Sequence, residues 1–106
     1  MKYITVQELN KALSTDRDFQ LIDVRELYEY EICNLNSKHI PMAEVSARLD
    51  EIDKEKTVCL MCKSGKRAEA VANLLETDFH FDDVLIVDGG IIAYAEEVDN
   101  NLEIYP

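Results

Sequence analysis

A cysteine stands at the head of a short basic segment in the second half of the chain. Residues 62–67 read Cys-Lys-Ser-Gly-Lys-Arg. They follow an apolar run and precede a helical pattern, which predicts a loop between a buried strand and a helix. The first N–H groups of such a helix have no partner within it and can bind an anion. Since Ser64 and Gly65 are small enough for the loop to curl tightly, we expect an anion-binding loop with the thiol of Cys62 at its mouth.

The same loop carries a concentration of positive charge. Lys63, Lys66 and Arg67 are three of the 11 basic residues in a chain whose net charge is −11. In so acidic a protein, this concentration indicates a site for an anion. Cations and a helix start also stabilise a thiolate, which is the nucleophilic form of cysteine. The predicted chemistry is nucleophilic attack by Cys62, and the alternative is a buried, unreactive cysteine at the end of a strand.

Apolar runs and helical patterns alternate along the whole chain. Sequential strands that are separated by helices, without hairpin turns, form parallel sheets through right-handed crossovers. We therefore expect an α/β fold, with a parallel sheet of about five strands and helices on both faces. The length of 106 residues predicts a single domain spanning 1–106. The expected strands lie near residues 3–4, 19–24, 39–40, 57–61 and 84–87.

Local signals place the five helices more finely. Thr5 and Glu8 form a capping box, which predicts a helix start, and Pro41 predicts another. In chain order, the expected apolar faces are Val6, Leu9 and Leu13; Tyr28, Ile32 and Leu35; Val45, Leu49 and Ile52; Ala68, Val71, Ala72 and Leu75; and Ile91, Tyr94, Ala95 and Val98.

Three side chains with chemical potential stand at the ends of expected strands. Asp23, Cys62 and Asp88 each follow or close an apolar run. In an open parallel sheet, ligands bind beyond the carboxyl ends of the strands. The sequence therefore predicts that the functional site lies at this edge.

Composition limits the partners and the compartment. The net charge of −11 would repel phosphates over most of the surface, which argues against nucleic acid as a partner. No apolar stretch approaches the length of a membrane span, and the first ten residues lack the apolar core of a signal peptide. We expect a cytoplasmic protein without a membrane partner, in which Cys33, Cys59 and Cys62 are free thiols.

Several segments together resemble a known family. They are 21–25 with 29–30, 39–41, 62–67 and 88–91, and their order and spacing are more specific than any one of them. Over nearly its whole length, the chain is similar to single-domain rhodanese sulfurtransferases. Within that family, residues 31–35 and 89–99 look most like one branch. This branch is the rhodanese domain of adenylyltransferases that load ubiquitin-like sulfur carriers for molybdopterin or tRNA thiolation.

The resemblance implies a reaction. Cys62 would attack the sulfane sulfur of a small donor, such as thiosulfate or a persulfide, and carry that sulfur as a persulfide. The amides and cations of the loop would hold the anionic persulfide, and a thiol, cyanide or a sulfur-carrier protein would remove its outer sulfur. The resemblance implies no metal and no organic cofactor.

Two further residues gain an expected role from the resemblance. Asp23 and Arg25 stand where the family has a carboxylate and an arginine below the active loop. Asp23 is expected to brace the loop, by accepting hydrogen bonds from its backbone or from Arg67, or to form a structural ion pair. These two roles are compatible with each other.

Two positions depart from the family's pattern. Some members that use thiosulfate carry an arginine where this chain has Glu29. A carboxylate at that position is expected to disfavour a dianionic donor. Tyr94 replaces a tryptophan that is often found in the last helix, and we expect it to be a packing substitution.

The remaining cysteines and histidines support other chemistry less well. Cys59 and Cys62 form a C-x-x-C pattern, but the helix starts after the second cysteine, whereas it starts at the first in thioredoxin-like pairs. Cys33 occurs in an apolar helical pattern and is expected in the core. His39 and His80 are too isolated to predict a Cys–His dyad, and no cluster offers the spacing of a metal site.

Two other functions stay open. A phosphatase or arsenate reductase of related fold places five residues between its cysteine and arginine, whereas four separate Cys62 from Arg67. The smaller loop suits a single sulfur atom better than a tetrahedral oxyanion. A rhodanese-fold binding module without activity is the second alternative, and it would be expected to lack the cysteine.

Overall fold

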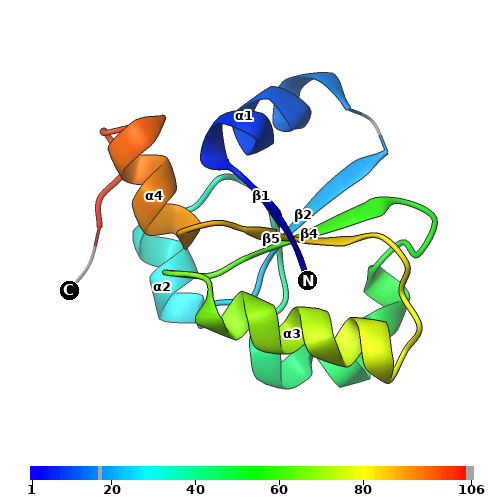
Figure 1. Cartoon of the computed structure of the whole chain (residues 1–106). Helices are drawn as coiled ribbons and strands as arrows, with labels where there is room; N and C mark the ends of the chain where they lie inside the picture. Colours follow the sequence, from blue (N-terminus) through cyan, green and yellow to red (C-terminus); the bar gives the residue numbers. More distant parts are fainter. Residues whose placement is uncertain (17, 105–106) are drawn as a thin grey trace.

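The computed structural model describes residues 1–16 and 18–104, so residues 17, 105 and 106 of the expected domain lie outside it. A five-stranded sheet lies between two layers of helices (Figure 1). The strand order is β1-β5-β4-β2-β3, and every described strand pair is parallel. The predicted α/β architecture is therefore confirmed. The strands are β1 (Lys2–Ile4), β2 (Phe19–Asp23), β3 (Lys38–His39), β4 (Thr57–Met61) and β5 (Val84–Val87).

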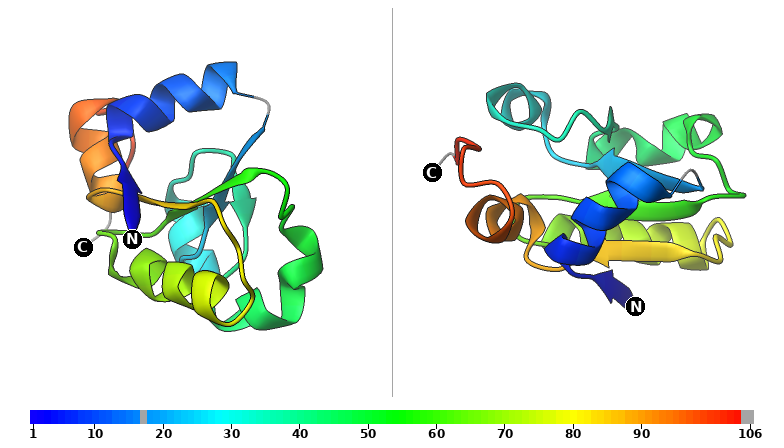
Figure 2. Two further views of the ribbon diagram at one scale, coloured as in Figure 1. Left: turned by 45° about the vertical axis from the view of Figure 1, so that its right-hand side comes forward. Right: turned by 90° about the horizontal axis from the view of Figure 1, so that it is seen from above.

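Helices cover both faces of the sheet. In Figures 1 and 2, the first and last helices lie on one face, and the ten-residue 3₁₀ segment and the longest helix lie on the other. The short second helix follows the carboxyl end of β2. The helices are α1 (Val6–Thr15), α2 (Leu27–Ile32), η1 (Met42–Glu51), α3 (Lys66–Thr77) and α4 (Gly90–Glu97). No helix in the described part of the chain is both long and apolar enough to cross a membrane.

Strand β4 lies at the centre of the sheet, with two strands on each side. Because side chains alternate between the faces of a strand, β4 supplies two separate apolar clusters. Val58 and Leu60 pack in the cluster below α3 and η1, and Cys62 continues this alternation. Cys59 and Met61 pack in the opposite cluster, below α1 and α4. The continuous burial of β4 explains why its sequence is an uninterrupted apolar run.

The predicted capping box at the start of α1 is confirmed. The Glu8 N–H donates to the Thr5 hydroxyl oxygen at 3.1 Å, and the Thr5 N–H donates to the Glu8 carboxylate at 2.9 Å. The bond from the Thr5 backbone is the largest cause that lowers the pKa of Glu8. Two donors at the start of the helix, which would otherwise lack partners, are thus satisfied.

The apolar face of α3 is the one the spacing predicts, but two other expected faces are wrong in part. All four expected α3 residues are buried. In α2, however, Tyr28 is 63% exposed and Ile32 is 41% exposed, while Glu29 is buried. This helix has only six residues, and polar contacts orient it: Arg25 donates to the Glu29 carbonyl and Arg67 donates to the Glu29 carboxylate. Leu13, near the end of α1, is also exposed.

The elements around Pro41 are shorter and less regular than expected. Strand β3 ends at His39, and the segment after Pro41 is 3₁₀ rather than α-helical. Its dihedral angles break at Arg48 (φ −124°, ψ 27°), and Ile52 lies beyond its end, although Ile52 is buried as expected. The side chain of Arg48 binds both Glu44 and Glu51, which holds the two halves of the segment together.

Candidate active site

Strand β4 delivers Cys62 to the amino-terminal end of α3. The strand ends at Met61 and the helix begins at Lys66, so four residues form the turn. Gly65 adopts φ +118°, a left-handed conformation that residues with a Cβ rarely adopt. This turn directs the Gly65 N–H at the Cys62 sulfur, 3.0 Å away, and the Ala68 N–H also reaches the sulfur at 3.5 Å. Cys62 is only 1% exposed, so its sulfur accepts these two backbone N–H groups in a buried setting.

The start of α4 holds the loop from the other side. The N–H groups of Ile91 and Ile92 donate to the carbonyl oxygens of Cys62 and Lys63 at 2.9 Å and 3.2 Å. Gly90 has φ +61°, and a Cβ on it would come within 2.5 Å of the Cys62 carbonyl oxygen and closer still to that of Lys63. The first amides of one helix thus bind the carbonyls of the loop that starts another. This contact explains why a glycine follows β5.

Arg67 is bound to a carboxylate from α2. Its Nη1 and Nη2 atoms donate to Oε1 and Oε2 of Glu29 at 2.6 Å and 3.0 Å. Glu29 is 3% exposed, and its Oε1 also accepts from the N–H of Glu26 at 3.0 Å. The sequence predicts for Glu29 only an effect on a dianionic sulfur donor. In the structure, Glu29 is the counter-ion of Arg67.

Asp23 binds Arg25, and both are fully buried. The Arg25 guanidinium donates to the two carboxylate oxygens of Asp23, with Nη2 2.7 Å from Oδ2. It also donates to the backbone carbonyls of Glu29 and Cys33, at the carboxyl end of α2. The structural ion pair that the sequence offered as one role of Asp23 is present, and it anchors α2. Glu29 accepts hydrogen bonds from Arg67, and a role of Asp23 in bracing the loop stays a prediction. A contribution of Asp23 and Arg25 to catalysis stays a prediction.

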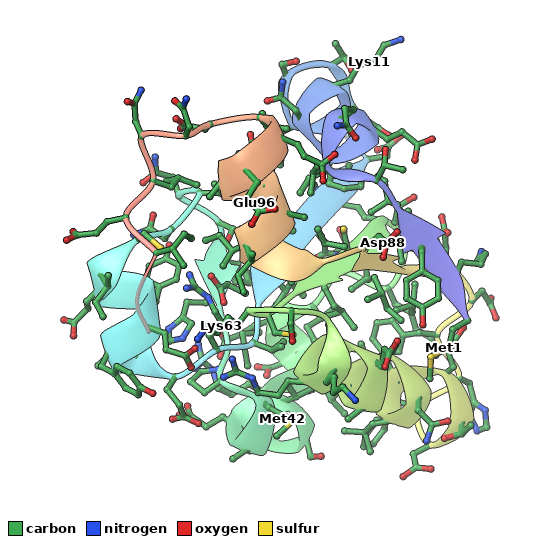
Figure 3. All side chains as sticks on the ribbon, turned by 60° about the vertical axis from the view of Figure 1, so that its left-hand side comes forward. Met1, Lys11, Met42, Lys63, Asp88 and Glu96 are labelled. Carbon is green, nitrogen blue, oxygen red and sulfur yellow. The ribbon has the colours of Figure 1, made fainter. Side chains whose placement is uncertain are left out.

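The other residues of the loop lie at its surface. Ser64 and Lys66 are exposed, and Lys63 is half-buried. Figure 3 shows Lys63 on the loop that joins β4 to α3, near α2 and α4. Asp88 does follow β5, as predicted, but it is exposed and its N–H donates to the Ile4 carbonyl of β1. In Figure 3 it lies on the side of β1, apart from Lys63.

The two other cysteines lie away from the loop chemistry. Cys59 and Cys62 are free thiols in different apolar clusters, on opposite faces of the sheet. This arrangement separates the C-x-x-C pair, because residues three apart on a strand point to opposite faces. Burial raises the pKa of Cys59 to about 12. Cys33 is 8% exposed in the cluster below α1 and α4, which agrees with the expected core position.

Comparison with known proteins identifies this arrangement. The model of the rhodanese-like domain family matches residues 5–97. The chain belongs to that family. The putative sulfurtransferase YtwF of Bacillus subtilis is 31% identical to this rhodanese-like chain over 99 residues, which cover 92% of the chain and 93% of YtwF. The crystal structure of a rhodanese-like domain protein from Staphylococcus aureus has a TM-score of 0.82 at 32% identity, and the match covers 100% of both chains.

A longer relative supports the predicted branch of the family. The probable adenylyltransferase/sulfurtransferase MoeZ of Mycobacterium tuberculosis is 32% identical over 106 residues. The match covers 96% of this rhodanese-like chain but 26% of MoeZ, so the chain spans about a quarter of that relative. The predicted similarity to the rhodanese domains of adenylyltransferases is confirmed. At the level of the family, these relatives associate the domain with sulfur transfer.

The sequence alone did not predict the ion pair that Glu29 forms with Arg67. The signal that could have found it is the Glu26-to-Glu29 spacing, which repeats the capping arrangement of Thr5 and Glu8. A carboxylate at the third position of a helix turns toward the helix start. Here the Glu29 carboxylate also reaches Arg67, in the first turn of α3.

Proposed function

We propose that this protein is a sulfurtransferase that carries a sulfane sulfur as a persulfide on Cys62. The observation that carries the proposal is the setting of the Cys62 sulfur, which accepts N–H groups from Gly65 and Ala68 at the start of α3. Backbone donors at a helix start stabilise negative charge on a sulfur atom. The similarity to YtwF, a putative sulfurtransferase, over nearly the whole chain supports the same function.

The reaction has two displacement steps. The Cys62 thiolate attacks the outer sulfur of thiosulfate, the S–S bond of the donor breaks, and sulfite leaves with the bonding electrons. The product is a persulfide anion on Cys62. An acceptor nucleophile then attacks the outer sulfur, and the new S–S bond breaks to regenerate the Cys62 thiolate. With cyanide as the acceptor, the product is thiocyanate. Neither step consumes an oxidant or a metal ion.

The loop is suited to hold the persulfide because its donors are already in place. The N–H groups that reach the Cys62 sulfur are fixed by the left-handed turn at Gly65 and by the contacts of α4 with the loop carbonyls. Donors that need no reorganisation stabilise a developing anion most effectively. Lys63, Ser64, Gly65, Lys66 and Arg67 form the binding loop in this proposal. Its natural acceptor is a thiol or a sulfur-carrier protein, as the adenylyltransferase/sulfurtransferase name of MoeZ suggests.

Transfer of sulfur from thiosulfate to cyanide tests the proposal. We expect wild-type protein to form thiocyanate and Cys62→Ser to form none, since serine keeps the size of the side chain but cannot carry the sulfur. Cys59→Ala is the matched control, because Cys59 lies on the other face of the sheet, and it should retain transfer. Equal loss of transfer in both variants, with both folded, would contradict a single-cysteine carrier. Hydrolysis of a phosphate ester without any thiocyanate would favour the phosphatase alternative.

A further inference from the structure

We infer that the Glu29–Arg67 ion pair tunes the preference of the site between sulfur donors of different charge. The pair cancels one cation of the loop, so that the site favours a dianion such as thiosulfate less, relative to a monoanionic sulfane donor, than it would if Glu29 were neutral. This inference rests on the proposed function and names its substrate class. Glu29 acts through Arg67 and the charge of the site, and is therefore a specificity residue rather than a catalytic one.

The first step is the fixed geometry of the pair. Two parallel bonds of 2.6 Å and 3.0 Å join the Arg67 guanidinium to the Glu29 carboxylate, which is the strong, bidentate form of such a pair. Glu29 is 3% exposed and receives a further bond from the Glu26 N–H. The carboxylate is therefore held in place from two sides. Since Arg25 binds the carbonyls at the other end of α2, the whole helix that carries Glu29 is anchored as well.

The second step is the position of the pair relative to the sulfur. Arg67 directly precedes Ala68, whose N–H lies 3.5 Å from the Cys62 sulfur. Arg67 therefore belongs to the helix turn that surrounds the sulfur, so that a unit charge on its side chain, or on its buried partner Glu29, contributes to the electrostatic potential of the site. The exposed Lys66, by contrast, is screened by water and salt. With the pair neutral overall, the positive potential of the loop is weaker than its sequence indicates.

The charge of a donor determines how strongly its interaction energy changes with the charge of the site. The Coulomb energy between two charges is proportional to their product, so one unit of charge near the site affects a dianion twice as strongly as a monoanion. The net charge of −11 on the whole protein repels both donors, and the dianion more. The ratio of the two kcat/KM values therefore reports the charge of the site. A loss of activity that affects both donors equally cancels in this ratio.

Two donors of matched chemistry make the test direct. Thiosulfate is a dianion, and methanethiosulfonate is a monoanion that transfers the same kind of sulfur and releases a sulfinate. The measured quantity is kcat/KM for thiosulfate divided by kcat/KM for methanethiosulfonate, with cyanide as the acceptor. Glu29→Gln removes one negative charge beside Arg67 and should raise this ratio about tenfold. Arg67→Gln removes one positive charge beside Glu29 and should lower it by a similar factor.

The double variant and a remote variant are the controls. Glu29→Gln with Arg67→Gln restores a neutral pair and should return the ratio to within about twofold of wild type, because the two charge changes cancel. Glu51→Gln changes the net charge of the protein by the same amount as Glu29→Gln, but at the Arg48–Glu51 pair of η1. It should leave the ratio unchanged. The ratio should also depend less on ionic strength in the double variant than in Arg67→Gln, since salt screens only an uncompensated charge.

The outcomes distinguish the inference from the proposed function. Opposite shifts of the ratio in the two single variants support the inference. If both single variants lower kcat/KM equally for the two donors, the pair is only structural and the inference is overturned, while wild-type transfer leaves the proposed function standing. If one variant does not fold, the sign of the shift in the other decides. Absence of transfer from either donor in the wild-type protein would overturn the function and the inference together.

Discussion

At the scale of single residues, Cys59 and Cys62 show how strand geometry separates similar side chains. They are three positions apart, yet Cys62 accepts N–H groups at the start of α3 while Cys59 lies in the cluster below α1 and α4. Burial among apolar side chains disfavours a thiolate, and it raises the pKa of Cys59 to about 12. The sulfur of Cys62, although also buried, accepts backbone N–H groups from Gly65 and Ala68. We therefore expect chemistry at Cys62 and a packing role for Cys59.

This difference predicts selective alkylation. We expect iodoacetamide to modify Cys62 in the folded protein at pH 8 and to leave Cys59 unmodified, because a raised pKa keeps Cys59 as the unreactive thiol below about pH 12. Raising the pH from 7 to 10 should therefore not increase modification of Cys59. Peptide mapping by mass spectrometry after timed alkylation gives the extent at each cysteine. The same reaction in denaturant is the control, in which all three cysteines should react. Modification of Cys59 as fast as Cys62 in the folded state would contradict the prediction.

At the scale of elements, the active loop depends on two helix starts. The start of α3 supplies the N–H groups that reach the Cys62 sulfur, and the start of α4 binds the carbonyl oxygens of the same loop. The close approach of α4 requires Gly90, since a Cβ there would meet the Cys62 and Lys63 carbonyls. The loop is therefore set by elements from both ends of the βαβ unit β4-α3-β5 and by the helix that follows it.

Gly90→Ala tests this arrangement. The added Cβ would push α4 away from the loop, and the left-handed φ of +61° would add strain. We expect the free energy of unfolding to fall by about 1–3 kcal/mol, because that is the range for a residue forced into a rare conformation. Sulfur transfer per folded molecule should fall as well.

Ala70→Gly, on an exposed position of α3, is the matched control for Gly90→Ala. It should lower stability by about 1 kcal/mol through helix propensity alone. Transfer per folded molecule should stay at the wild-type level, because Ala70 faces solvent rather than the loop. If Gly90→Ala behaved like Ala70→Gly, with stability reduced and transfer unchanged, the contact with α4 would not matter for activity. Urea unfolding and the cyanide assay, measured on the same preparations, separate these results.

Patterns that depend on one element were predictable from the sequence, and those that depend on neighbours were not. The apolar run of β4, the capping box of Thr5 and the buried face of α3 all follow local rules, and the structure confirms them. The orientation of α2 does not follow its apolar spacing, because Arg67 and Arg25 draw Glu29 and the helix carbonyls inward. Of the site, the sequence predicted the loop and its place at the strand ends. It did not predict the ion pair between Glu29 and Arg67, because the two residues lie 38 positions apart in the sequence.

At the scale of the whole molecule, the two apolar clusters share one sheet. Residues of β4 contribute to both, so that loss of packing on one face exposes the strand that supports the other. The net charge of −11 is distributed over the molecule that surrounds a locally basic loop. Such a surface suits small anions only where the loop overcomes the general repulsion.

The shared sheet predicts a single cooperative unfolding transition, as expected if 1–106 forms one domain. Far-UV circular dichroism and tyrosine fluorescence should give coincident urea curves, since Tyr94 lies in α4 on one face of the sheet, and Tyr3 of β1 donates to Glu69 of α3 on the other. Repeating the experiment at two protein concentrations controls for association. Two separated transitions, or curves that differ between the two probes, would show that the layers unfold independently.

The intact mass of the protein tests the proposed persulfide on Cys62 most directly. After incubation with thiosulfate or methanethiosulfonate and removal of the donor, we predict that wild-type protein gains the mass of one sulfur atom. Peptide mapping should locate this sulfur on Cys62, and addition of cyanide should remove it. Cys62→Ser should gain nothing, while Cys33→Ala and Cys59→Ala should gain one sulfur as wild type does. The added sulfur on Cys33 or Cys59, or its persistence in Cys62→Ser, would contradict a carrier that uses Cys62 alone.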